Sequence, residues 1–123
     1  MIGYVTLGTN DITRAAKFYD ALLAEIGAKR FMDSDKFIAW SVSPDKPGLS
    51  VIKPYNGEPA TVGNGVMVAL IVDSTDKVNA LHAKALELGG KDEGAPGPRG
   101  DTGLYVGYFR DLDGNKLNIF CMK

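Results

Sequence analysis

The chain of 123 residues contains one cysteine, Cys121, and one histidine, His82. A structural zinc site made of Cys and His needs three or four such side chains and is therefore excluded. A single cysteine cannot close a disulfide within the chain. A catalytic Ser-His or Cys-His pair would depend on His82, but its neighbours follow a helical apolar pattern, which favours a packing role.

The chain also lacks an excess of either charge and any long apolar run. Lys and Arg number 14 and Asp and Glu 15, a formal net charge of −1, with no basic stripe. We therefore expect no nucleic-acid partner. No apolar stretch approaches the roughly 20 residues that span a bilayer, and the first residues do not resemble a secretion signal. We expect no membrane partner, a cytoplasmic location and one domain large enough to fold around its own core.

The first half of the chain alternates strand-like and helix-like patterns. Apolar residues recur at helical spacing after Asn10 and Asp11, either of which can serve as N-cap, and Gly27 marks the helix end. β-branched and alternating runs bounded by turn residues predict strands. The predicted order is strand 2–8, helix, then strands 29–33, 37–43 and 49–53.

The second half repeats this order after a Pro- and Gly-containing segment. A strand over 66–72 precedes a cap at residues 74–76 and a helix closed by Gly89 and Gly90. A short strand over 91–93 and a loop over 94–100 follow. Strands 104–110 and 116–122 form a hairpin around Asp113-Gly114, a two-residue turn signal.

The two halves can be aligned with nearly constant offsets. A shift of 63 residues superposes the helices, and a shift of 68 places Trp40 over Tyr108 and Ser50 over Asn118, ten residues apart in each half. Such a duplication predicts an α+β fold of tandem βαβββ modules. We expect one domain, 1–123, with module one at 1–54, a linker at 55–64 and module two at 65–123, and a concave surface between the modules.

Three motifs carry a family resemblance: residues 4–8 leading to Asp11-Ile12 and Phe18-Tyr19, residues 65–70, and residues 110–117 before the final strand. With these motifs the chain resembles the vicinal oxygen chelate superfamily, which includes glyoxalase I, bleomycin- and fosfomycin-resistance proteins and extradiol dioxygenases. The resemblance covers essentially the whole chain. It implies a glyoxalase-like fold with a curved mixed sheet that forms a cleft, and a homodimer.

In metal-dependent members of that superfamily, His, Gln or Glu side chains from four strand positions hold a divalent ion. The resemblance places these positions at Tyr4, Ser50, Met67 and Asn118, none of which is His, Asp or Glu. Phenol, hydroxyl, thioether and neutral amide groups are poor ligands for such an ion. The sequence therefore predicts no metal and no other cofactor.

Strand alternation extends this set into a candidate ligand-binding cleft. Residues two apart face the same side, which adds Thr6 and Phe120, and the ten-residue step adds Trp40 and Tyr108. Arg99, in the predicted loop beside the cleft, can clamp an anion or lie solvated. The aromatic residues can also simply fill the space of a lost metal, and Tyr4 can pair with Asn118. The predicted cleft residues are Tyr4, Thr6, Trp40, Ser50, Met67, Arg99, Tyr108, Asn118 and Phe120.

Three functions remain open. The first is binding of a small aromatic or anionic molecule without a metal, which aromatic walls with a few polar groups favour. The second is a metal-dependent lyase, isomerase or dioxygenase of the glyoxalase type, which the four ligand positions oppose. The third is a metal-free enzyme in which Tyr4, Tyr108 or Asn118 polarises a carbonyl and Arg99 neutralises an anion. Whether any reaction is catalysed stays open, as does a protein-interaction role.

Overall fold

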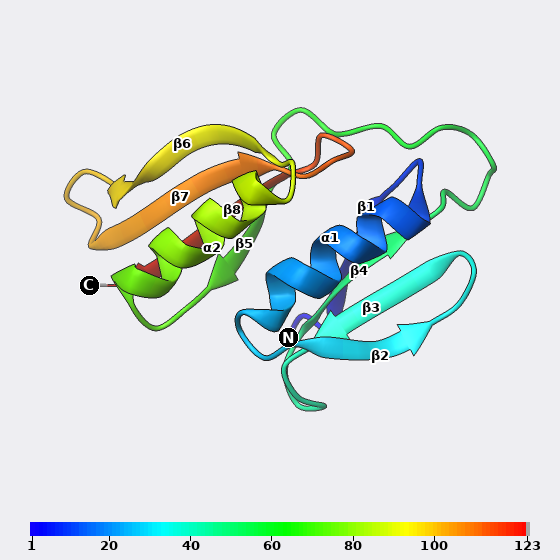
Figure 1. The fold of residues 1–123 in the computed structure, drawn as a ribbon, viewed down its shortest axis with the longest axis horizontal. Helices are drawn as coiled ribbons and strands as arrows, with labels where there is room; N and C mark the ends of the chain where they lie inside the picture. The colour runs from blue at the N-terminus through cyan, green and yellow to red at the C-terminus, as the bar shows by residue number, and fades with distance from the viewer. Residues whose placement is uncertain (123) are drawn as a thin grey trace. The chain divides into compact units, whose positions relative to one another are not determined.

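The computed structural model describes residues 1–122, which form two compact units, residues 1–62 and 63–122. Each unit has one helix lying along one face of a four-stranded sheet (Figure 1). Both follow the order βαβββ, so the predicted α+β fold of tandem modules is confirmed.

The first unit contains five elements with one parallel strand pair. They are β1 (Tyr4–Gly8), α1 (Ile12–Ala24), β2 (Lys29–Asp33), β3 (Phe37–Ser41) and β4 (Gly48–Ile52). The sheet order is β1-β4-β3-β2, with β1 parallel to β4 and the other pairs antiparallel. The helix connects β1 to β2, which lie at opposite edges of this sheet.

The second unit repeats that topology, and its last three strands are longer than those of the first unit. Its elements are β5 (Val68–Ile71), α2 (Thr75–Glu87), β6 (Lys91–Pro98), β7 (Leu104–Arg110) and β8 (Lys116–Met122). The sheet order is β5-β8-β7-β6, with β5 parallel to β8. The edge strands β1 and β5 therefore occupy matching places in their own sheets.

Both helices begin at side chains that cap their first turn. The Asp11 carboxylate accepts a hydrogen bond from the Arg14 amide at 3.0 Å, and the Ser74 hydroxyl accepts one from the Lys77 amide at 3.2 Å. These bonds satisfy amides that have no partner within the helix. No helix within residues 1–122 is long and apolar enough to cross a membrane.

Each helix buries an apolar stripe against one face of its sheet. In the first unit Phe18 and Leu22 of α1 are buried with Val51 of β4. In the second unit Leu81 of α2 is buried with Ile119 of β8. The neighbouring residues of β4 and β8, which the sequence places in the cleft, therefore lie on the side turned away from the helices. That opposite side of each sheet is the one that can meet a ligand.

Two predicted boundaries differ in the second unit. Strand β5 starts at Val68, so Val66 and Met67 precede it with 58% and 40% of their surfaces exposed. Residues 94–98, expected in a loop, belong to β6. An edge strand tolerates Pro96, which has no amide hydrogen, and the β6–β7 register shifts twice where β6 departs from regular pairing.

The β7–β8 hairpin is confirmed, but its turn is longer than two residues. The ladder ends at Arg110 and Lys116, and the Asp111 amide donates to the Asn115 carbonyl at 2.9 Å. The Asp111 carboxylate also accepts bonds from the backbone amides of Asp113 and Asn115 and from the Asn115 side chain. Gly114 supplies the positive φ of 89° that this turn requires.

Candidate functional site

Three predicted site residues, Tyr4, Thr6 and Ser50, lie on the sheet face of the first unit that is turned away from α1. The register pairs Thr6 with Ser50, and Ser50 Oγ lies 2.8 Å from both the Val5 carbonyl oxygen and Thr6 Oγ1. The Tyr4 ring is 58% exposed and meets Phe37 edge to face at 6.0 Å. Protein groups already engage the Ser50 hydroxyl, while Tyr4 remains open to solvent.

Trp40, predicted on this same face, lies on the other side of the sheet. It is 1% exposed, contacts the Tyr19 ring of α1 at 5.6 Å, and donates from Nε1 to Asp20 Oδ1 at 2.8 Å. In the β3–β4 ladder the partner of Ser50 is Ala39, eleven residues earlier, whereas Tyr108 and Asn118 pair ten residues apart. One extra residue in the first hairpin reverses side-chain orientation, so the prediction for Trp40 is wrong.

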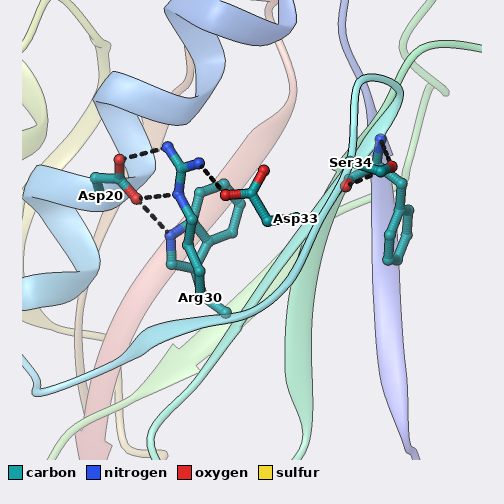
Figure 2. A network of polar contacts seen from close by, with 6 residues as sticks. Asp20, Arg30, Asp33 and Ser34 are labelled. Carbon is teal, nitrogen blue, oxygen red and sulfur yellow. Dashed lines mark hydrogen bonds and ion pairs between the residues drawn. The ribbon is translucent and has the colours of Figure 1, made fainter.

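Trp40 instead belongs to a polar network that joins α1 to β2 and β3. Figure 2 shows the Arg30 guanidinium between Asp20 and Asp33, with bonds of 2.9 and 2.7 Å to Asp20 and 2.8 Å to Asp33. The hydrogen bonds from Arg30 hold the pKa of the Asp20 carboxyl below its usual range, helped by the Trp40 bond. Ser34 closes the β2–β3 turn nearby through bonds with Phe37. This network is structural rather than part of a ligand site.

Four predicted site residues come together in the second unit. Tyr108 and Asn118 are direct partners in the β7–β8 ladder, and Phe120 lies two residues further on the same face. Arg99 follows the last residue of β6, and its guanidinium carbon lies 4.7 Å from the centroid of the Tyr108 ring. Because β6 is longer than predicted, Arg99 is positioned by a strand end rather than by a free loop.

Sequence reasoning missed Lys116, a fifth member of this group. Its Nζ atom lies 5.4 Å from the Tyr108 ring centroid. Two cations at these distances interact with the electron-rich face of the ring. Alternation along β8 was the available signal, because Lys116 precedes Asn118 by two residues and so shares its face. Within residues 1–122 neither Arg99 nor Lys116 forms an ion pair, whereas Arg110 is paired with Glu93.

Asn118 is the most unusual member of the group. Its side chain is 6% exposed, and in the part of the chain that the structure describes its Oδ1 atom has no hydrogen-bond partner. Leaving a buried acceptor unpaired costs about 1–3 kcal/mol, and such groups in folded proteins call for an explanation. We name Arg99, Tyr108, Lys116, Asn118 and Phe120 the cationic tyrosine site.

The four positions that the family resemblance assigns to metal ligands do not present a suitable donor set. Tyr4 and Ser50 belong to the first unit, and Met67 and Asn118 to the second. The Ser50 hydroxyl is occupied by protein groups, and a thioether with a neutral amide is a weak pair for a hard cation. No group of three His, Cys, Asp or Glu side chains within residues 1–122 could hold an ion. Metal-free function stays a prediction that this donor chemistry supports.

Comparisons with known proteins agree with this architecture. The family model described as Glyoxalase/Bleomycin resistance protein/Dioxygenase superfamily matches residues 1–119. The structure of a glyoxalase/bleomycin resistance protein from Albidiferax ferrireducens is 35% identical, covers 100% of this chain and 99% of its own, and has a TM-score of 0.89. A search of curated proteins gives no significant match.

More distant structures share the fold. A glyoxalase/bleomycin resistance protein/dioxygenase family enzyme from Burkholderia phytofirmans is 18% identical, with 98% of each chain covered and a TM-score of 0.78. The fosfomycin resistance protein FosX from Listeria monocytogenes is 14% identical, covers 100% of this chain and 93% of its own, and has a TM-score of 0.74. At these identities the likeness concerns the fold alone.

Proposed function

The chain belongs to the Glyoxalase/Bleomycin resistance protein/Dioxygenase superfamily, and on that premise we propose that it binds a small aromatic anion at the cationic tyrosine site without a metal. The observation that carries the proposal is the buried, unpaired Oδ1 atom of Asn118 beside Tyr108. A ligand that donates a hydrogen bond to this atom removes the cost of leaving it unpaired. The site thus selects a molecule with a donor group.

The surroundings of Asn118 define the rest of the ligand. Arg99 and Lys116 lie 4.7 and 5.4 Å from the Tyr108 ring centroid, and neither forms an ion pair within residues 1–122, so an anionic group can pair with them. Lys116 also acts at longer range on Glu93, whose pKa is lowered mainly by its hydrogen bond from Arg110 and to a smaller extent by Lys116. Tyr108 and Phe120 are half-buried and offer ring surface for a flat molecule. A ring that carries both a carboxylate and a hydroxyl donor meets all three requirements.

We test this with 3-hydroxybenzoate, whose hydroxyl cannot reach its own carboxylate, and with benzoate as the matched ligand that lacks the donor. Isothermal titration should show 3-hydroxybenzoate binding about tenfold more tightly, the effect of one hydrogen bond to a buried acceptor. In the Asn118→Leu variant that preference should disappear. In Arg99→Gln both ligands should weaken together, whereas the charge-matched control Lys77→Gln, on α2 at the other face of the sheet, should bind as the wild type does.

Two results would contradict this proposal. Equal affinity for the two ligands in the wild-type protein would show that Asn118 Oδ1 does not take part. Equal weakening in Arg99→Gln and Lys77→Gln would show that only net charge matters.

Metal dependence has its own test, since the proposal excludes the Lewis-acid chemistry of metal-dependent relatives. Chelator-treated protein is unfolded thermally with nickel, zinc, manganese, cobalt or ferrous iron in excess. A site filled at about 100 times its dissociation constant adds roughly 2.7 kcal/mol and raises the midpoint by several degrees. We expect no metal-specific shift. A shift that Asn118→Ala abolishes would instead favour the lyase or dioxygenase function.

We also propose that the chain forms a homodimer. The edge strands β1 and β5 each have a single partner within their own sheets, and an open edge is a natural place for further pairing. Light scattering at micromolar concentration should give twice the mass of 13.2 kDa. A species of monomer mass would overturn this proposal.

A further inference from the structure

A hollow of about 540 Å³ lies in the first unit, apart from the residues of the cationic tyrosine site. It is bounded by the chain just before α1, by the ends of β3 and β4, and by the segment that follows β4. Thr9, Lys36, Ile52, Lys53, Tyr55 and Pro59 are among its lining residues. This volume is within the range of small-molecule sites.

Two lysines give the hollow an unusual charge arrangement. Lys36 and Lys53 continue the β3–β4 ladder beyond the Phe37–Ile52 pair, and the Lys53 amide donates to the Lys36 carbonyl at 2.9 Å. Neither lysine forms an ion pair within residues 1–122. Like charges opposite each other on a ladder repel, and a bound anion would relieve that repulsion. Glu58, also in the lining, leaves a net charge of +1.

The outer wall of the hollow is held in place by Asn10. Its Oδ1 atom accepts from the Ala60 amide at 2.7 Å, and its Nδ2 atom donates to the Ala60 carbonyl at 3.3 Å. Gly8 permits this approach, because a Cβ atom there would lie only 3.0 Å from the Cβ of Ala60. The segment expected to be a linker therefore folds back as a fixed wall, which lowers the entropic cost of binding.

We propose that this hollow is a second binding site, specific for a small organic anion whose charge lies between Lys36 and Lys53 and whose apolar part packs on Ile52 and Pro59. The site goes beyond the proposed function, because it shares no residue with the cationic tyrosine site. Phosphate monoesters and carboxylates of suitable size both have this chemistry.

The experiment is a titration of the full chain with phenyl phosphate, followed by amide NMR. The Thr9 and Gly57 amide signals should shift and saturate, and inorganic phosphate or benzyl alcohol alone should bind more weakly, since each supplies only half of the contacts. Lys36→Gln and Lys53→Gln should each weaken binding about threefold, and the double variant about tenfold, as expected for exposed charge pairs. Lys17→Gln, an exposed lysine of α1, is the charge-matched control.

Signals from Tyr108 and Asn118 report the cationic tyrosine site separately, so failure at one site is distinguishable from failure at the other. Absence of shifts at Thr9 and Gly57 up to about 10 mM ligand would overturn the proposal. Equal weakening in Lys17→Gln and Lys36→Gln would overturn it as well, because the effect would then belong to net charge.

Discussion

Ser50 and Asn118 hold matching positions in the two sheets, each on the strand next to the parallel edge strand. Ser50 is fully buried and its hydroxyl bonds with Val5 and Thr6. Asn118 is nearly as buried, but its Oδ1 atom has no partner within residues 1–122. One copy of the repeated module thus satisfies this position internally, while the other keeps an acceptor available.

The β3–β4 and β7–β8 hairpins differ in length by one residue. The extra residue in the β3–β4 hairpin turns Trp40 toward α1, whereas Tyr108 in the β7–β8 hairpin is turned away from α2. In the ladder the counterpart of Trp40 is Phe109, which pairs with Leu117 as Trp40 pairs with Leu49. Both counterparts are buried. A one-residue difference in length thus decides which aromatic residue joins the core.

Replacing each of these two aromatic residues by alanine should reveal the difference in orientation through the free energy of unfolding. Trp40→Ala should lower the free energy of unfolding by about 3–5 kcal/mol, because it empties a fully buried site. Tyr108→Ala should cost less than about 1 kcal/mol, because that side chain is only half-buried. Urea unfolding followed by circular dichroism measures both. Similar losses in the two variants would show that the aromatic residues play equivalent roles.

Replacing Ser50 or Asn118 by an apolar residue should change the stability of the protein in opposite directions. Ser50→Ala should destabilise the protein by about 1 kcal/mol, since it leaves the Val5 carbonyl without this donor. Asn118→Leu should stabilise it by about 1 kcal/mol, because it removes an unpaired buried acceptor. Thermal unfolding without ligand measures the two midpoints. Destabilisation by Asn118→Leu would mean that the amide is satisfied in the free protein.

A smaller change is expected in the Asp20 network, whose counterpart in the second unit is the contact between His82 of α2 and Asp92 of β6. Asn at position 20 keeps an acceptor for Trp40 but loses the charge that Arg30 neutralises. Asp20→Asn should therefore cost about 0.5–1 kcal/mol near neutral pH, as expected for a partly exposed pair. Urea unfolding at several pH values measures this cost.

The pH dependence of that cost has a definite sign. The pKa of Asp20 is lowered in the folded state, so its contribution is present above the ordinary value of 3.8 and is lost as the pH falls through the folded value. The wild-type protein and Asp20→Asn should therefore converge in stability below about pH 4. Asp35→Asn, in the β2–β3 turn, is the control. A constant difference across the acid range would exclude the carboxylate as its cause.

Element order, helix caps and helix-facing strand sides could be predicted because they follow from local patterns. Asp11 and Ser74 have side chains that can cap a helix. Apolar residues such as Val51 and Ile119 alternate along their own strands, as expected for a strand that packs under a helix. The candidate site was predictable in the second unit, where Tyr108, Asn118 and Phe120 share one regular hairpin. These predictions depend on residues that are close together in the sequence, where the alternation of side chains and the pairing of the strands are regular.

The errors arose where register depends on more distant pairing. The ten-residue step between paired positions places Trp40 on the wrong face, because nothing in the local sequence shows that the first hairpin contains one more residue. Arg99 was expected in a loop because Pro and Gly dominate residues 94–98, although an edge strand accepts them. The wall formed by Asn10 and Ala60 depends on residues 50 positions apart, a contact that no periodicity reports.

Trp40 is the single tryptophan of the chain, and its buried indole lies within the first unit. Its fluorescence is therefore a local signal for half of the molecule, while far-ultraviolet circular dichroism follows the helices and strands of both halves. Coincident transitions by the two methods would mean that the two modules unfold as one cooperative body. Separate transitions would reveal that each copy of the ancestral repeat still melts on its own.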